Sequence, residues 1–106
     1  MHRLVILESP FSGDVDANRR YLDACLADSL RRGESPYASH KLLTDTLDDT
    51  DPVQREQGMT AGFAWHKVAE ASVVYTDRGI SRGMRRGIEH ARALGLPVEF
   101  RQLGHK

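Results

Sequence analysis

The sequence predicts an α/β domain built on a parallel sheet, and three observations support this. Short apolar runs that are typical of buried strands alternate with longer amphipathic segments. Residues that favour helix starts and stops bound the longer segments. The chain has 106 residues, 40% hydrophobic and 28% charged, which suits one globular domain. We therefore expect a single domain over residues 1–106.

The first half of the chain contains a strand, a helix and a weaker strand. Residues 4–7 form a continuous apolar run, which predicts a strand buried on both faces. A helix is expected from about Val15 to Arg32, with Asp14 as its N-cap and Gly33 just after its end. Residues 35–39 predict a second strand. The apolar stripe of the helix comprises Val15, Leu22, Cys25, Leu26, Ser29 and Leu30.

The second half continues the alternation. Asp51 followed by Pro52 is a helix-start signal, and this helix is expected to run to about Ala69. Residues 72–76 form the clearest strand after the first. Ser81 caps a further helix that Gly95 ends, and residues 98–101 form a last strand.

This order of elements predicts a flavodoxin-like three-layer sandwich with a mostly parallel four-stranded sheet of order 2-1-3-4. In such sheets ligands bind outside the carboxyl ends of the strands, at the point where the strand order reverses. That point lies here between the first and third strands. Two loops are expected to meet there, residues 8–14 and residues 77–83.

Composition excludes several classes of function. Fifteen Lys and Arg balance fifteen Asp and Glu, which argues against a nucleic acid polymer or an anionic membrane as partner. The single cysteine, Cys25, excludes a disulfide framework and a thiolate metal cage, and its place on the apolar stripe predicts an inert core residue. No apolar run approaches the roughly 20 residues of a membrane span, and the apolar start is too short for a signal peptide. We expect a cytoplasmic protein.

We expect neither a metal site nor a cofactor. The acidic cluster Asp48, Asp49 and Asp51 lacks the spacing and the glycine of a calcium loop, and helix capping and solvation explain it better. The histidines show no metal-ligand spacing.

Both predicted loops contain residues that are suited to binding an anion. Ser9, Ser12 and Gly13 form a turn of small residues before a helix, and Ser81, Arg82 and Gly83 offer the same chemistry with an arginine added. Helix capping alone explains either loop. Together, at the predicted switch point, the two loops suit a nucleotide or a sugar phosphate.

Residues 79–83 also match the G-x-S-x-G pattern of serine hydrolases. The acid and histidine that should follow are missing in usable form, because His90 lies on the same predicted helix and His105 lies in the tail. Ser81 is therefore expected to act as a helix cap.

The predicted second helix carries Gly58, Gly62, Phe63 and Trp65. The two glycines lie one turn apart and allow another backbone to approach closely. The aromatic residues belong either to the core or to a subunit interface, and we favour a homo-oligomer contact.

The opening residues 7–14, with Asn18, resemble the start of small nucleoside 2-deoxyribosyltransferase-like proteins, which occur in phage and bacterial genomes. Ser39-His40, residues 47–52 and residues 77–84 followed by 89–91 agree with the same superfamily. The likeness covers roughly residues 3 to 101. It implies a flavodoxin-like fold and cleavage of the bond between a base and its sugar.

The resemblance also implies roles for individual residues. The first loop would bind the sugar, Asp77 would lie beside the base or sugar, and the turn at 81–84 would bind a phosphate or its substitute. A neighbouring subunit often completes such a site. The implied ligand-binding residues are Ser9, Pro10, Phe11, Ser12, Gly13, Asn18, His40, Ser81, Gly83 and Met84.

The sequence departs from the superfamily at the nucleophile. A glutamate on the helix after the third strand usually attacks the sugar, forming a glycosyl ester, and the family spacing from Ser81 places that residue at Gly87. Glu89 lies two residues further on, which at about 100° per residue points it roughly 200° away. A shifted register that uses Glu89, or a nucleophile from Asp14 or Asp77, stays open.

The sequence therefore leads to three hypotheses. The first is a protein that binds a nucleotide or nucleoside-like ligand at the carboxyl ends of strands 1 and 3, without the usual catalysis because Gly87 replaces the nucleophile. The second is an active N-glycosidase or deoxyribosyltransferase acting on nucleosides or their monophosphates. The third is a structural assembly module.

Overall fold

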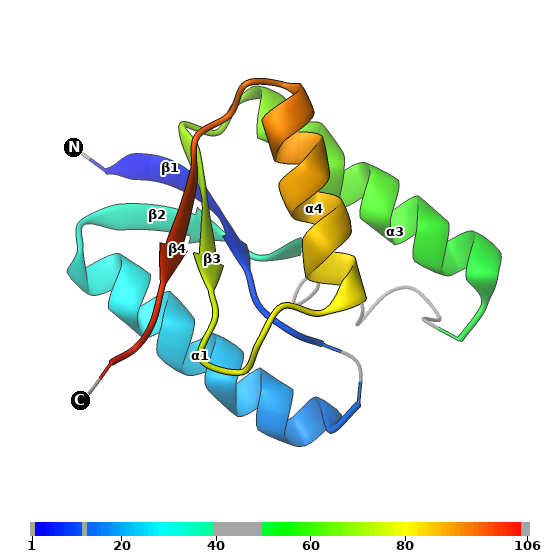
Figure 1. The fold of residues 1–106 in the computed structure, drawn as a ribbon, viewed down its shortest axis with the longest axis horizontal. Coiled ribbons are helices and arrows are strands. Elements are labelled where there is room, and N and C mark those ends of the chain that lie inside the picture. The colour runs from blue at the N-terminus through cyan, green and yellow to red at the C-terminus, as the bar shows by residue number, and fades with distance from the viewer. Residues whose placement is uncertain (1, 12, 40–49, 105–106) are drawn as a thin grey trace.

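The computed structural model describes residues 2–11, 13–39 and 50–104 (Figure 1). Its sheet has four parallel strands in the order β2-β1-β3-β4, which confirms the predicted fold class and strand order. The predicted Ser12, His40, Asp48 and Asp49 lie outside the described residues. The strands are β1 (Arg3–Glu8), β2 (Glu34–Tyr37), β3 (Ala71–Tyr75) and β4 (Val98–Arg101).

Helices cover both faces of the sheet (Figure 1). Helix α1 (Val15–Arg31) packs on one face, and α4 (Arg82–Ala93) packs on the other, beside α3 (Pro52–Ala64). The predicted caps are confirmed, because Asp14, Asp51 and Ser81 each accept a hydrogen bond from a backbone N–H of the first turn. No helix within the described ranges is long and apolar enough to cross a bilayer.

Helix α3 ends earlier than its sequence predicts. It stops at Ala64, and a short 3₁₀ turn, η1 (Trp65–Lys67), follows in place of the α-helix expected to Ala69. The chain must extend here to join the sheet, since the Glu70 N–H already donates to the Leu4 carbonyl of β1 at 2.7 Å. Sheet pairing thus competes with the last helical turn.

The core lies mainly between the sheet and α1, where Val5 and Leu7 of β1 pack with Leu22 and Cys25. The predicted stripe of α1 was wrong at its two ends, because Val15 and Leu30 are 37% and 56% exposed. The buried face consists of Asn18, Tyr21, Leu22, Cys25 and Ser29, at the spacing of a single helical face. Cys25 is a fully buried core residue, as predicted, and burial raises the pKa of its thiol to about 12.

Beneath α1, an ion network joins the two edge strands. Arg101 of β4 donates to Glu34 of β2, with Nη2 and Oε2 2.5 Å apart, and both side chains are at least 93% buried. Arg3 and Glu99 extend the network across the sheet. Ser29 of α1 donates to the second Glu34 oxygen at 2.8 Å. These hydrogen bonds, chiefly from Arg101, hold the pKa of Glu34 below its usual range.

Removing one partner of this pair should destabilise the fold. We expect Arg101→Met to lower the free energy of unfolding by about 3–5 kcal/mol, because Glu34 then stays buried without its cation. Urea denaturation measures the change. The double variant Arg101→Met with Glu34→Gln should recover much of the loss. A double variant as unstable as the single one would contradict this explanation.

Candidate functional site

The carboxyl ends of β1 and β3 lie side by side, as the predicted site requires. Glu8, the last residue of β1, is in register with Val74 of β3. Side chains alternate along a strand, so Glu8 shares the α4 face of the sheet while Leu7 packs toward α1. The strand therefore places the Glu8 carboxyl group against α4.

Glu8 lies directly against Gly87 of α4. A Cβ atom at position 87 would be 2.2 Å from Glu8 Oε2 and 2.9 Å from its Cδ, far closer than any real contact. The Glu8 carboxyl group thus occupies the space in which a side chain at 87 would begin. Gly87 is buried, and the helix approaches the strand this closely because it has no side chain there.

The Glu8 carboxyl group has no protein partner among residues 2–11, 13–39 and 50–104. None of their side chains or backbone N–H groups donates a hydrogen bond to it, and none of their cations forms an ion pair with it. Burial raises the pKa of Glu8 to about 8, because the charged form loses solvation without compensation. The side chain remains partly exposed. A carboxyl group with a perturbed pKa is a candidate functional residue.

The first loop is held in shape by its own contacts. Ser9 and Pro10 are buried, and Asn18 donates from Nδ2 to the carbonyl oxygen of Phe11 at 3.0 Å. Asp14 is exposed and caps α1 by accepting from Ala17 N at 3.1 Å. Asn18 and Asp14 therefore hold the loop and the helix in place in this structure.

The turn before α4 presents backbone groups to the solvent. Ser81 Oγ accepts from the N–H of Met84, and the Met84 side chain packs in the core with Val74 and Ile88. Gly83 is exposed, and a Cβ there would meet nothing within 4 Å. The N–H groups of the first turn are suited to an anion, since they have no intrahelical partner.

Asp77 anchors the C-terminal segment. Its carboxylate accepts from the Tyr21 hydroxyl at 2.7 Å and from the Leu103 N–H at 2.9 Å. Burial raises the pKa of Asp77, but these hydrogen bonds outweigh that effect, so the pKa lies below its usual value. Asp77 is thus an ionised, fully engaged carboxylate, unlike Glu8.

Glu89 does not share the site with Glu8. It is exposed, whereas Gly87 and Ile88 on the same helix are buried. This agrees with the expected divergence of the two positions around the helix. The structure therefore brings Glu8 against Gly87 of α4 and leaves Glu89 exposed.

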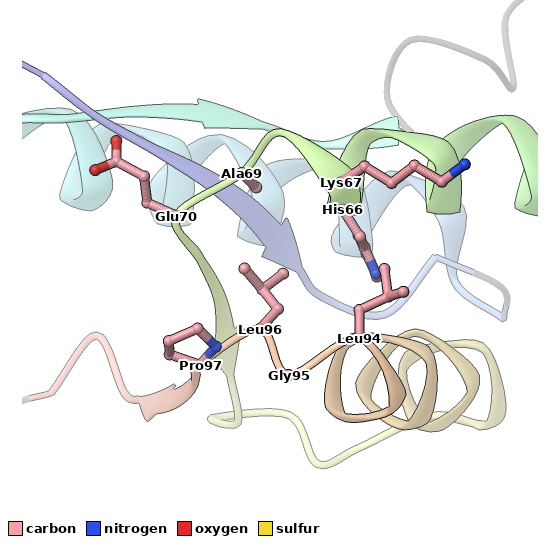
Figure 2. Close-up of a pocket in the computed structure, with 8 residues that line it drawn as sticks. All are labelled: His66, Lys67, Ala69, Glu70, Leu94, Gly95, Leu96 and Pro97. Carbon is pink, nitrogen blue, oxygen red and sulfur yellow. The ribbon is translucent and has the colours of Figure 1, made fainter.

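A hollow of about 470 Å³ lies at the opposite end of the sheet, before β3 and β4 begin (Figure 2). Leu94 and Leu96 point into it, while Lys67 and Glu70 point away. His66 is also part of its lining, and burial lowers the pKa of that histidine to about 4, so it is neutral. Small-molecule sites need a few converging polar groups, which this lining does not offer.

Among the described residues, no group of three His, Cys, Asp or Glu could hold a metal ion.

A family model described as "Domain of unknown function (DUF7768)" matches residues 3–101. The chain belongs to this family. No curated protein matches the sequence. Among solved structures, the chain is similar to a 2-deoxyribosyltransferase from the psychrotolerant bacterium Bacillus psychrosaccharolyticus, with a TM-score of 0.74 and 13% identity over 97% of this chain and 74% of that one. This DUF7768 member and the transferase share a fold.

Sequence reasoning missed Glu8 as a site residue. The signal was present, because Glu8 is a charged residue that ends an otherwise apolar strand at the predicted switch point. Its contact with Gly87 joins residues 79 positions apart in the sequence, and no local pattern reports such a contact.

The raised pKa of Glu8 predicts how the free energy of unfolding depends on pH. An unfolded glutamate has a pKa of about 4.3, so the folded state binds the proton more tightly. The free energy of unfolding should fall as pH rises from about 4.5 to 8, by a few kcal/mol at about 1.4 kcal/mol per pKa unit. Glu8→Gln should remove this loss and be the more stable protein at pH 8.5.

Urea denaturation at pH 5 and pH 8.5 tests the prediction. The matched control is Glu89→Gln, which removes an exposed carboxylate from α4 and should leave the pH dependence unchanged. An identical pH dependence in Glu8→Gln and the wild type would show that Glu8 is not perturbed.

Proposed function

We propose that this protein binds a nucleotide or nucleoside-like ligand at the carboxyl ends of β1 and β3. The observation that carries the proposal is the Glu8 carboxyl group, partly exposed and without a protein partner among the described residues, at the point where strand order reverses. The hydroxyl groups of a sugar would donate hydrogen bonds to this carboxyl group.

The start of α4 would hold the phosphate of such a ligand. Arg82 and Arg85 are exposed there, and the open space in front of Gly83 gives an anion access to the first backbone N–H groups. A helix N-terminus and a nearby arginine both favour negative charge. The shared fold with a 2-deoxyribosyltransferase supports a deoxynucleoside or its monophosphate as the ligand.

A charge placed at the α4 cap tests the phosphate part of this site. Ser81→Asp should keep the helix, since Asp caps helices as well as Ser does. It should weaken binding of a deoxynucleoside monophosphate at least tenfold and leave binding of the unphosphorylated nucleoside nearly unchanged. Isothermal titration calorimetry measures both affinities.

Ser81→Asn is the matched control, because it also caps the helix but adds no charge. We expect it to bind the monophosphate as the wild type does. Equal affinities of Ser81→Asp and Ser81→Asn for the monophosphate would show that the phosphate does not bind at the start of α4.

The second candidate function is self-assembly through α3. Of its residues only Gly62 is buried, and the Cβ that Gly62 lacks would lie 2.6 Å from Ser39 Oγ. The group that approaches Gly62 is thus the side chain of Ser39 in the same chain, not another backbone as expected. Most of the remaining surface of α3 is free for a second copy, including Val53 at 75% exposed and the neighbouring Trp65 at 49%.

If α3 forms a homo-oligomer, Gly58→Leu should disrupt it. The substitution adds bulk to the helix surface while favouring the helix over glycine. Light scattering should then give the mass of one chain where the wild type gives a multiple of it. An unaltered mass would show that Gly58 does not lie in a subunit interface.

A further inference from the structure

We propose that the outer edge of β4 pairs with β4 of a second copy of this chain, so that the two sheets join into one across a two-fold axis at Phe100. Strand β4 is the last strand on its side of the sheet (Figure 1). An edge strand presents unpaired N–H and C=O groups, to which another strand can bind. This interface uses other residues than the α3 surface and the ligand site proposed above.

The hydrogen bonds between β3 and β4 determine which backbone groups of β4 face outward. The N–H group of Thr76, directly after β3, donates to the carbonyl oxygen of Arg101 at 2.8 Å. Backbone groups point to alternate sides along a strand, so the N–H and C=O groups of Val98 and Phe100 point away from β3. None of the described residues forms a hydrogen bond with these outward groups.

The opposite edge of the sheet, β2, is protected against such pairing. The Leu4 carbonyl oxygen faces β3, because it accepts from the Glu70 N–H, so the backbone groups of the next residue, Val5, face β2. Pro36 is in register with Val5 and therefore faces outward. Its ring stands where an edge N–H would be, which blocks a further strand. Strand β4 contains no proline, so of the two edges it is the open one.

Phe100 is suited to lie at the centre of the interface. Its side chain is 49% exposed, whereas Val98 on the same face of the sheet packs against the core under α4. The Cζ of Arg92 lies 5.8 Å from the centre of the Phe100 ring. In an antiparallel pair centred on Phe100, the two Phe100 residues exchange both backbone hydrogen bonds and bring their rings together. Cross-strand aromatic pairs of this kind stabilise a sheet.

The charges of β4 favour this register and identify a second copy as the partner. Glu99 and Arg101 lie on the other face of the sheet, with Glu99 Oε1 and Arg101 Nη2 3.1 Å apart. A pair centred on Phe100 places Glu99 of each copy opposite Arg101 of the other. A pair centred on Glu99 would instead place two carboxylates opposite each other, which is destabilising. The strand is thus complementary to its own copy, as a two-fold interface requires.

A proline at position 100 tests the interface. Because the Phe100 N–H faces outward, Phe100→Pro removes no hydrogen bond within the chain, and edge strands accept proline. Sedimentation should give the wild type the mass of two chains, or a multiple of two, and Phe100→Pro half the wild-type mass. The dissociation constant should rise about 100-fold or more, since each copy loses a donor and leaves a carbonyl group unpaired.

Phe100→Val is the matched control, because it keeps the outward N–H group and favours a strand. It should still form the dimer, with a dissociation constant raised about tenfold or less by the loss of the aromatic pair. Circular dichroism and urea denaturation confirm that both variants are folded.

Hydrogen exchange tests the same interface in the wild type, without any substitution. In a dimer paired through β4 the Phe100 N–H is hydrogen-bonded, so its exchange with solvent should be slow. In a dimer formed through α3 this group faces solvent and should exchange rapidly. Nuclear magnetic resonance measures the exchange rate of this one amide.

The outcomes decide between the interfaces. A wild type with the mass of one chain overturns the inference, as does rapid exchange of the Phe100 amide in a dimeric wild type. A dimer that Gly58→Leu dissociates and Phe100→Pro leaves intact also overturns it, and assigns the contact to α3. Half the mass in Phe100→Pro, with a dimeric Phe100→Val and a slowly exchanging Phe100 amide in the wild type, supports it. Calorimetry with the monophosphate tests the ligand site independently of these results.

Discussion

The close approach of α4 to the end of β1 is the constraint on which the candidate site depends. It requires that position 87 have no side chain, because a Cβ there would lie 2.2 Å from the Glu8 carboxyl group. The absence of a side chain at position 87 leaves room for the Glu8 carboxyl group beside the buried face of α4.

Carboxyl groups in this small protein differ according to their partners. Glu34 and Asp77 are ionised because Arg101 in one case, and Tyr21 with a backbone N–H in the other, stabilise the charge. Glu8 lacks such partners in the described structure and has its pKa raised to about 8. The contacts of Glu34 and Asp77 stabilise the fold. Glu8 has no contact of this kind among the described residues.

Local signals predicted most of the fold. The caps at Asp14, Asp51 and Ser81 act over three or four residues, so a single sequence contains the information needed to place them. The errors occurred where tertiary contacts compete with local preference. Val15 and Leu30 have the right residue type but lie at the ends of α1 outside the buried face, and α3 ends early because the chain must join the sheet.

The sequence by itself determined the α/β class and the strand order, because hydrophobic periodicity and capping are local. The resemblance to the superfamily places a carboxylate at position 87, where this chain has glycine. Only the tertiary structure showed that Glu8 fills that space and that Glu89 is exposed. The physical reason is that the environment of a carboxyl group depends on packing between segments far apart in the chain, which no periodic pattern encodes.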